Sequence, residues 1–174
     1  MGVIATFPDK YISMLATTLM LDSEISKLLY YKNVFDKDIF SLDEVENPIA
    51  EFKDKNVFLN RRVADVFGKV TNPELFIFIN LYQDEPCSIG SGKSKFIDTL
   101  RLDLGVICND SLRSILNGTR EVIVADRMIR LLKETECLQG IGEPKISRTR
   151  QVYQIPYGYN AYIITVEVDY FNSW

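Results

Sequence analysis

Apolar and polar residues recur along this chain with two periods, one typical of helices and one typical of strands. After Pro8, apolar residues return every three or four positions as far as Tyr31, which predicts one bent helix or two helices in series over residues 8–31. Asp22 or Ser23 can cap the second of these helices through its side-chain oxygen. The N-terminal segment is therefore expected to be helical.

Four later segments have the patterns of strands. Residues 75–82 form a short, aromatic-rich apolar run that is typical of a central strand. Residues 97–106 alternate between polar and apolar, which predicts a strand with one buried face that pairs antiparallel with the first. Two further alternating segments, 145–155 and 159–170, are separated by a turn at Pro156-Tyr157-Gly158.

A second helical segment opens at Asn117-Gly118-Thr119, between the strands. Its apolar residues recur at helical spacing, whereas its charged residues fall elsewhere. The expected buried face comprises Val122, Ala125, Ile129 and Leu132, and the charged residues are Arg120, Asp126, Arg127, Arg130 and Lys133. Residues 33–60 have a weaker pattern, which predicts a long excursion with a short helix.

Strands on both sides of a helix indicate an α+β fold, with a mixed or antiparallel sheet of about four strands and helices packed on one face. A chain of 174 residues, 47% of them hydrophobic, is long enough to bury a core. We expect a single domain over residues 1–174, with the sheet-and-helix core in residues 73–171.

The composition excludes several classes of chemistry. The chain has no histidine, so Ser–His and Cys–His nucleophiles and the usual zinc ligand sets cannot form. Cys87, Cys108 and Cys137 are widely spaced and odd in number, which fits neither a disulfide framework nor a metal-binding pair. We expect no catalytic, cofactor-binding or metal-binding residues, and a strand position that buries Cys108 more than Cys87.

Charge and hydropathy limit the partners. A net charge of -4 argues against a protein that coats nucleic acid. No apolar stretch reaches the length of a membrane span and no signal peptide is recognisable, so the chain is expected to stay in the cytoplasm where it is made. The carboxylates of residues 36–46 match no metal-binding spacing and are interpreted as a solvated acidic surface.

One segment, Ile89-Gly90-Ser91-Gly92-Lys93-Ser94, partly resembles a phosphate-binding loop. That motif requires glycine where Cys87 stands, and a helix must follow it so that backbone N–H groups face the phosphates. An alternating strand follows here instead. The segment is therefore interpreted as a flexible hairpin tip that exposes Lys93 and Lys95.

Exposed chain at the ends of predicted strands is expected to mediate interactions. The candidate interaction residues are Lys93, Lys95, Tyr157, Gly158, Tyr159, Phe171 and Trp174. Because aromatic residues dominate interface energies, we expect Tyr157 or Tyr159, together with Phe171 and Trp174, to be partly buried only on assembly. The alternative is that these tyrosines cover the core of the domain itself.

The ordered set of features resembles the neck or tail-joining proteins of tailed bacteriophages, including tail terminators and head–tail connector subunits. The segments that carry the resemblance are Glu24–Tyr31, Gly105–Asn109, Glu121–Lys133, Gly140–Gly142 and Tyr157–Tyr170.

This resemblance implies a structural protein of the virion, made in the host cytoplasm and located in the neck. It would form a homo-oligomeric ring between the head connector and the tail tube, with no cofactor and no membrane. Its partners would be further copies of itself and neighbouring neck, connector or tail-tube proteins, with DNA only as passing cargo. Two alternatives stay open: a non-viral protein–protein adaptor, and a small-molecule-binding or enzymatic domain that uses Lys93 or paired acids.

Overall fold

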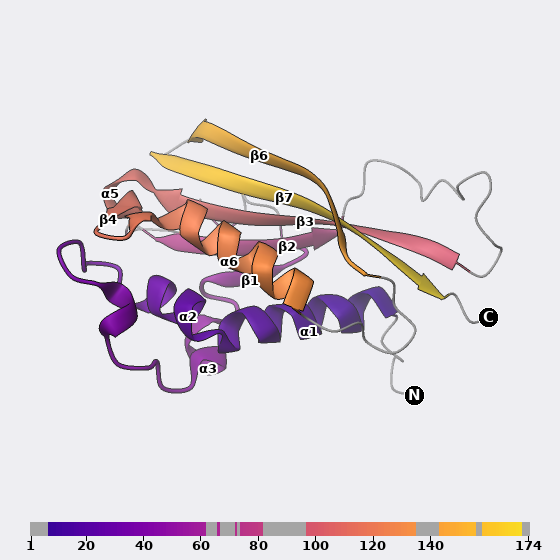
Figure 1. The fold of residues 1–174 in the computed structure, drawn as a ribbon, viewed down its shortest axis with the longest axis horizontal. Coiled ribbons are helices and arrows are strands. Elements are labelled where there is room, and N and C mark those ends of the chain that lie inside the picture. The colour runs from indigo at the N-terminus through magenta and orange to yellow at the C-terminus, as the bar shows by residue number, and fades with distance from the viewer. Residues whose placement is uncertain are drawn as a thin grey trace.

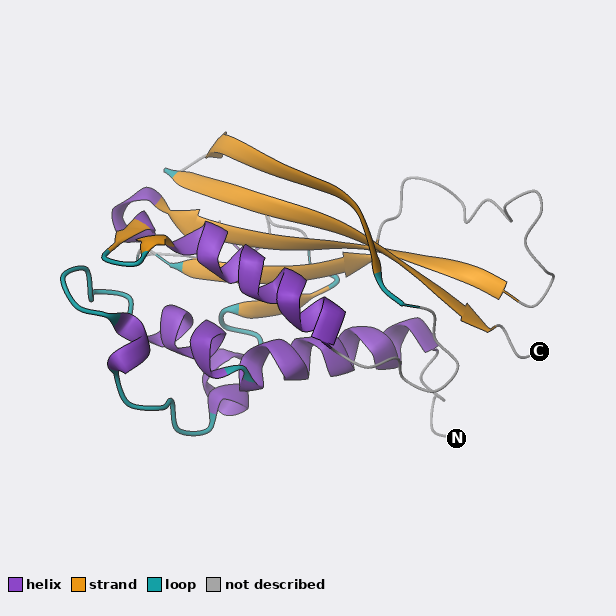
Figure 2. Cartoon of the chain, in the orientation of Figure 1, coloured by secondary structure: helices purple, strands orange, loops and turns teal. Residues whose placement is uncertain are grey.

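A five-stranded mixed sheet forms the centre of the protein, with helices on one of its faces and a two-stranded ribbon at one end (Figures 1 and 2). This is the predicted α+β class, with one more strand in the sheet than expected. The computed structural model describes residues 7–61, 66, 72, 74–81, 97–134, 143–155 and 158–171.

The N-terminal segment forms two helices in series, as predicted. Helix α1 (Phe7–Leu21) and helix α2 (Ser23–Tyr30) are separated by Asp22, whose carboxylate accepts a hydrogen bond from the backbone N–H of Ile25 at 3.0 Å. This capping contact satisfies one of the free N–H groups at the start of α2.

The long excursion contains more structure than its pattern indicates. It includes a 3-10 helix η1 (Ile39–Ser41), helix α3 (Pro48–Phe52) and strand β1 (Val57–Leu59). Strand β1 pairs parallel with β2 at the margin of the sheet. A strand of three residues is too short for alternation to be recognised, which explains why the sequence predicts only a short helix here.

The sheet has the strand order β1-β2-β3-β7-β6. Strand β2 (Leu75–Leu81) pairs antiparallel with β3 (Ile97–Asn109), as predicted. Strand β7 (Tyr159–Phe171) lies between β3 and β6 (Lys145–Ile155) and pairs antiparallel with both. The central β3–β7 ladder is 13 residues long, so it is the longest strand pairing in the described sheet.

The connection from β3 crosses onto the helical face. It passes through α5 (Asp110–Arg113) and the ribbon of β4 (Ser114–Ile115) and β5 (Gly118–Thr119), then enters α6 (Arg120–Glu134).

The predicted buried face of α6 is partly wrong. Ala125 and Leu132 are buried as expected, but Val122 is exposed and Arg120 is fully buried. The true buried face comprises Arg120, Glu121, Val124, Ala125, Met128 and Leu132. The face is displaced because Arg120 and Glu121 find polar partners inside the protein.

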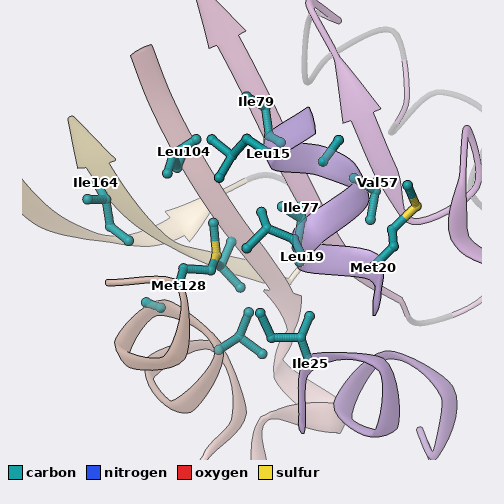
Figure 3. Close-up of a cluster of buried hydrophobic side chains, with 14 of the residues drawn as sticks. Leu15, Leu19, Met20, Ile25, Val57, Ile77, Ile79, Leu104, Met128 and Ile164 are labelled. Atoms are coloured by element: carbon teal, nitrogen blue, oxygen red, sulfur yellow. The ribbon is translucent and has the colours of Figure 1, made fainter. Parts of the chain in front are cut away.

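Apolar side chains pack on both faces of the sheet. The larger core fills the space between sheet and helices, where Leu19 and Met128 meet Ile77, Leu104 and Ile164 (Figure 3). The opposite face carries a smaller cluster, hereafter the far-face cluster. Its buried members are Phe58, Phe76, Phe78, Ile107, Tyr159 and Ala161.

Candidate functional site

The candidate interaction residues do not gather at one place. Gly158 and Tyr159 lie where β7 begins, opposite Asn109, whereas Phe171 lies at the other end of β7, opposite Ile97. At about 3.3 Å per residue, these ends are roughly 40 Å apart. Lys93, Lys95, Tyr157, Trp174, the loop resembling a phosphate site, Cys87 and the side chain of Phe171 lie outside the described residues.

Tyr159 decides between two expectations. Its side chain is only 4% exposed in the single chain, and its ring stacks on Phe76 with centroids 6.1 Å apart. Burial also raises the pKa of the Tyr159 phenol. For Tyr159 the alternative therefore holds, because this tyrosine belongs to the far-face cluster of its own domain, whereas Tyr157 lies outside the described residues.

The turn before Tyr159 is fixed by polar contacts. Gly158 has a φ of 74°, a conformation that side-chain-bearing residues rarely adopt. Its carbonyl accepts a 2.8 Å hydrogen bond from the backbone N–H of Asp110, and the Asp110 carboxylate accepts one from the amide of Asn160. These contacts join the start of β7 to the end of β3.

The end of the sheet that carries Gly158, α5 and the β4–β5 ribbon is called the ribbon end below. Arg120 is its most buried charge. Its guanidinium donates hydrogen bonds to four backbone carbonyls and lies against the C-terminal end of α2, where the helix dipole is negative. The acceptors are Leu112 at 2.9 Å, Leu28 at 2.7 Å, Tyr31 at 3.2 Å and Lys32 at 3.2 Å. Burial lowers the pKa of Arg120, and these carbonyls replace the hydration that its charge has lost.

A second buried charge lies beside Arg120. Glu121 is fully buried, and its Oε1 accepts a hydrogen bond of 2.5 Å from Nε of Arg113. The Arg113 guanidinium also lies 5.6 Å from the centre of the Tyr153 ring. Oε2 of Glu121 has no hydrogen-bond partner in the described part of the chain. Arg113 therefore links α6 to the edge strand β6 through one charge-assisted contact and one cation–π contact.

Cys108 lies next to this cluster, at the end of β3, and is buried as predicted. Burial, with a smaller contribution from the Glu121 carboxylate, raises the pKa of its thiol to about 12. Because only the thiolate reacts, Cys108 has the properties of a core residue rather than of a nucleophile.

We expect Cys108 to resist maleimide labelling at pH 8 in the folded protein and to react fully after denaturation. Since its folded pKa lies well above pH 8, less than about one thiol in a thousand would be ionised, and burial blocks access as well. Mass spectrometry of the labelled peptides measures both states. Rapid labelling of Cys108 in the native protein would contradict its placement in β3.

Exposed apolar side chains distinguish the surface of the ribbon end. Leu116, at the tip of the ribbon, is 64% exposed, and Tyr153 on β6 is 59% exposed. Asn117 donates a 3.2 Å hydrogen bond to Asp38, which places the ribbon tip against the segment that also carries exposed Phe35. Residues of this kind concentrate at sites of protein contact. Leu116 is not noticeable in the sequence because it stands in a polar turn.

Two further features of the described residues are the grouping of possible metal ligands and the length and hydropathy of the helices. They contain no group of three or more histidine, cysteine or acidic side chains placed to hold a metal ion. Among them, no helix is long and apolar enough to cross a membrane. The fold and the ribbon end therefore define an α+β domain whose buried charges hold its own elements together and whose exposed apolar residues are available for contact.

The chain belongs to the YomW family, whose model matches residues 22–168 and thus most of the sequence. YomW is named after a protein from a Bacillus prophage region, so the family is associated with bacteriophages. The matched range begins at the Asp22 cap of α2 and includes every strand except the end of β7. No curated protein matches the chain.

Proposed function

We propose that this chain is a structural subunit of a phage particle, which forms a ring in the neck between head connector and tail tube. The observation that carries the proposal is the ribbon end, which holds Leu116 and Tyr153, the two most exposed large hydrophobic side chains among the described residues. Membership of a phage-associated family supports a role in a phage. The resemblance to neck proteins supplies the position in the particle.

The chemistry of the ribbon end suits contact between subunits. Leu116 and Tyr153 offer apolar area, and the Tyr153 hydroxyl is available at the rim, where it already donates to Gln151 at 2.7 Å. Apolar and aromatic anchors surrounded by polar groups are typical of interfaces between folded partners. Arg113 fixes one side of the Tyr153 ring, so little order has to be gained on binding.

The charge of the chain suits a ring that DNA passes through. A protein with net charge -4 releases few counterions from phosphates, so duplex DNA would not be held. The partners in this proposal are further copies of the chain and the neighbouring neck, connector or tail-tube proteins, with DNA as passing cargo.

The test images the purified chain and the phage particle. We expect closed rings by negative-stain electron microscopy and antibody labelling at the junction of head and tail. Leu116→Ser should leave the melting temperature within about 1 °C of wild type, because the side chain is 64% exposed, yet reduce ring formation at least tenfold. The matched control, Ser114→Ala at an exposed position of the same ribbon, should form rings normally.

Two results would contradict the proposal. A wild-type chain that stays monomeric at all concentrations and is absent from purified particles would exclude a structural role. Labelling at the distal tail tip or on the capsid surface would exclude the neck.

A further inference from the structure

The outer margin of β6 is an edge of the sheet as formed by the described residues. Strand β6 pairs with β7 on one side, and no described residue pairs with it on the other. The register is interrupted between Ile146 and Arg148 and again between Val152 and Ile155, which leaves a regular stretch between the two irregularities. Backbone N–H and C=O groups at such an edge form a template for another extended segment.

The first half of this edge strand is basic. Lys145, Arg148 and Arg150 are exposed, β6 contains no acidic residue, and none of the three cations forms a salt bridge with a described residue. Two copies of β6 paired with each other would place these cations close together, which is unfavourable. The edge therefore favours an acidic partner segment over a second copy of itself.

The chain contains such a segment. Residues 43–45 lie between two bends and belong to no helix or strand, and Asp43 and Glu46 are exposed without a salt bridge to any described residue. The backbone groups of residues 44–46 form no hydrogen bond within the described part of the chain. Both the charges and the backbone of this segment are thus available to a neighbour.

Internal contacts already hold the acidic segment in place. Nζ of Lys27 lies 2.8 Å from the Glu44 carboxylate and donates to the carbonyl of Phe40 at 3.1 Å. The Tyr31 hydroxyl donates to the carbonyl of Asp43, also at 3.1 Å. A segment that is ordered before binding loses less conformational entropy when it pairs.

The two surfaces lie on opposite sides of the molecule. Strand β6 forms the upper margin of the sheet in Figure 1, whereas residues 42–46 lie on the far side of the helical layer. A contact between them in two copies is head-to-tail, and such contacts repeat from copy to copy and close into a ring when the rotation between copies allows it.

We infer that the outer edge of β6 binds the acidic segment 42–46 of a second copy of this chain, through backbone hydrogen bonds to residues 43–45 and ion pairs between the exposed cations of β6 and Asp43 or Glu46. This inference rests on the proposed ring and names the contact that would build it. It also explains why opposite charges that form no salt bridge within the described part of the chain lie on two separate elements.

The test reverses the charges of each surface. An edge variant, Arg148→Glu with Arg150→Glu, and a segment variant, Asp43→Lys with Glu46→Lys, should both fold with wild-type melting temperatures, because all four residues are exposed. Each alone should associate at least tenfold more weakly in analytical ultracentrifugation. An equimolar mixture of the two should recover association, because every contact then joins opposite charges again. The matched control for the edge variant, Arg130→Glu with Lys133→Glu on α6, makes the same net charge change as that variant and should assemble normally.

A zero-length carbodiimide cross-link gives a direct readout. In a mixture of isotopically light and heavy chains, Lys145 should couple to Asp43 or Glu46 of a different copy. If the edge variant still formed rings as readily as the wild-type chain, this inference would be wrong, but the proposed ring would remain supported. Loss of duplex-DNA binding with unchanged assembly would show that the edge contacts nucleic acid instead. A wild-type chain that never self-associates would overturn the inference and the ring together.

Discussion

Replacement of Arg120 by alanine is expected to lower the free energy of unfolding by about 4 kcal/mol, an effect on the scale of breaking a buried charged contact. The guanidinium is fully buried and donates hydrogen bonds to four backbone carbonyls. These carbonyls belong to α2, to the two residues that follow α2, and to α5. Removal of the guanidinium leaves those carbonyls without a donor and creates a cavity, and both changes destabilise the native state.

Urea denaturation followed by circular dichroism measures this change. Arg120→Lys should recover only part of the stability, because one ammonium cannot reach acceptors that lie on both α2 and α5. The matched control is Arg130→Ala on the same helix, whose exposed i,i+4 pair with Asp126 is worth about 0.5 kcal/mol or less. Equal denaturation midpoints for Arg120→Ala and Arg130→Ala would refute the assigned role of Arg120.

Tyr159→Ser is expected to lower stability by about 3 kcal/mol, which corresponds to a fall in melting temperature of roughly 6–12 °C for a chain of this size. The ring is buried against Phe76 in the far-face cluster, so its loss leaves a cavity. Tyr153→Ser, in the same pair of strands, provides the comparison. Tyr153 is 59% exposed, so this variant should melt like wild type and should instead weaken association.

Differential scanning calorimetry of the two variants measures both melting temperatures and so distinguishes a core tyrosine from a surface tyrosine in the same hairpin. If Tyr159→Ser melted like wild type while Tyr153→Ser melted much lower, the assignment of these residues to core and surface would be reversed.

The long elements were predictable because their patterns extend over several turns or strand repeats. Strand β7 alternates between apolar and polar residues from Ile164 to Val168, so Ile164, Val166 and Val168 could be assigned to one face, which is buried in the structure. The break at Asp22 was predictable because a capping side chain leaves a local signature. In contrast, β1 has only three residues and gains its stability from pairing with β2, a contact that is distant in sequence.

Buried charges were not predictable. Arg120 and Glu121 are polar residues in the first turn of a helix, where solvent exposure is the ordinary expectation. Their burial depends on carbonyls of residues 28–32 and on Arg113, and no local pattern reveals those partners.

The interaction site was predictable only in outline. The sequence indicated that the turn at Gly158 lies at a strand end, which the structure confirms. It left open whether Tyr159 lies at an interface or covers the core, because alternation shows which residues share a face and not whether that face is covered. The far-face cluster covers it here.

The position of β7 also determines the order in which the sheet can form. Residues of β6 leave the ribosome before those of β7, yet β7 inserts between β6 and β3. Until β7 inserts, β6 has no described neighbour in the sheet. The β3–β7 ladder joins residues that are about 50 positions apart in the sequence even where the two strands are closest along the chain, and such distant pairing slows folding. Before β7 pairs with it, the positive charges of β6 would repel the β6 strands of other nascent chains and so oppose aggregation.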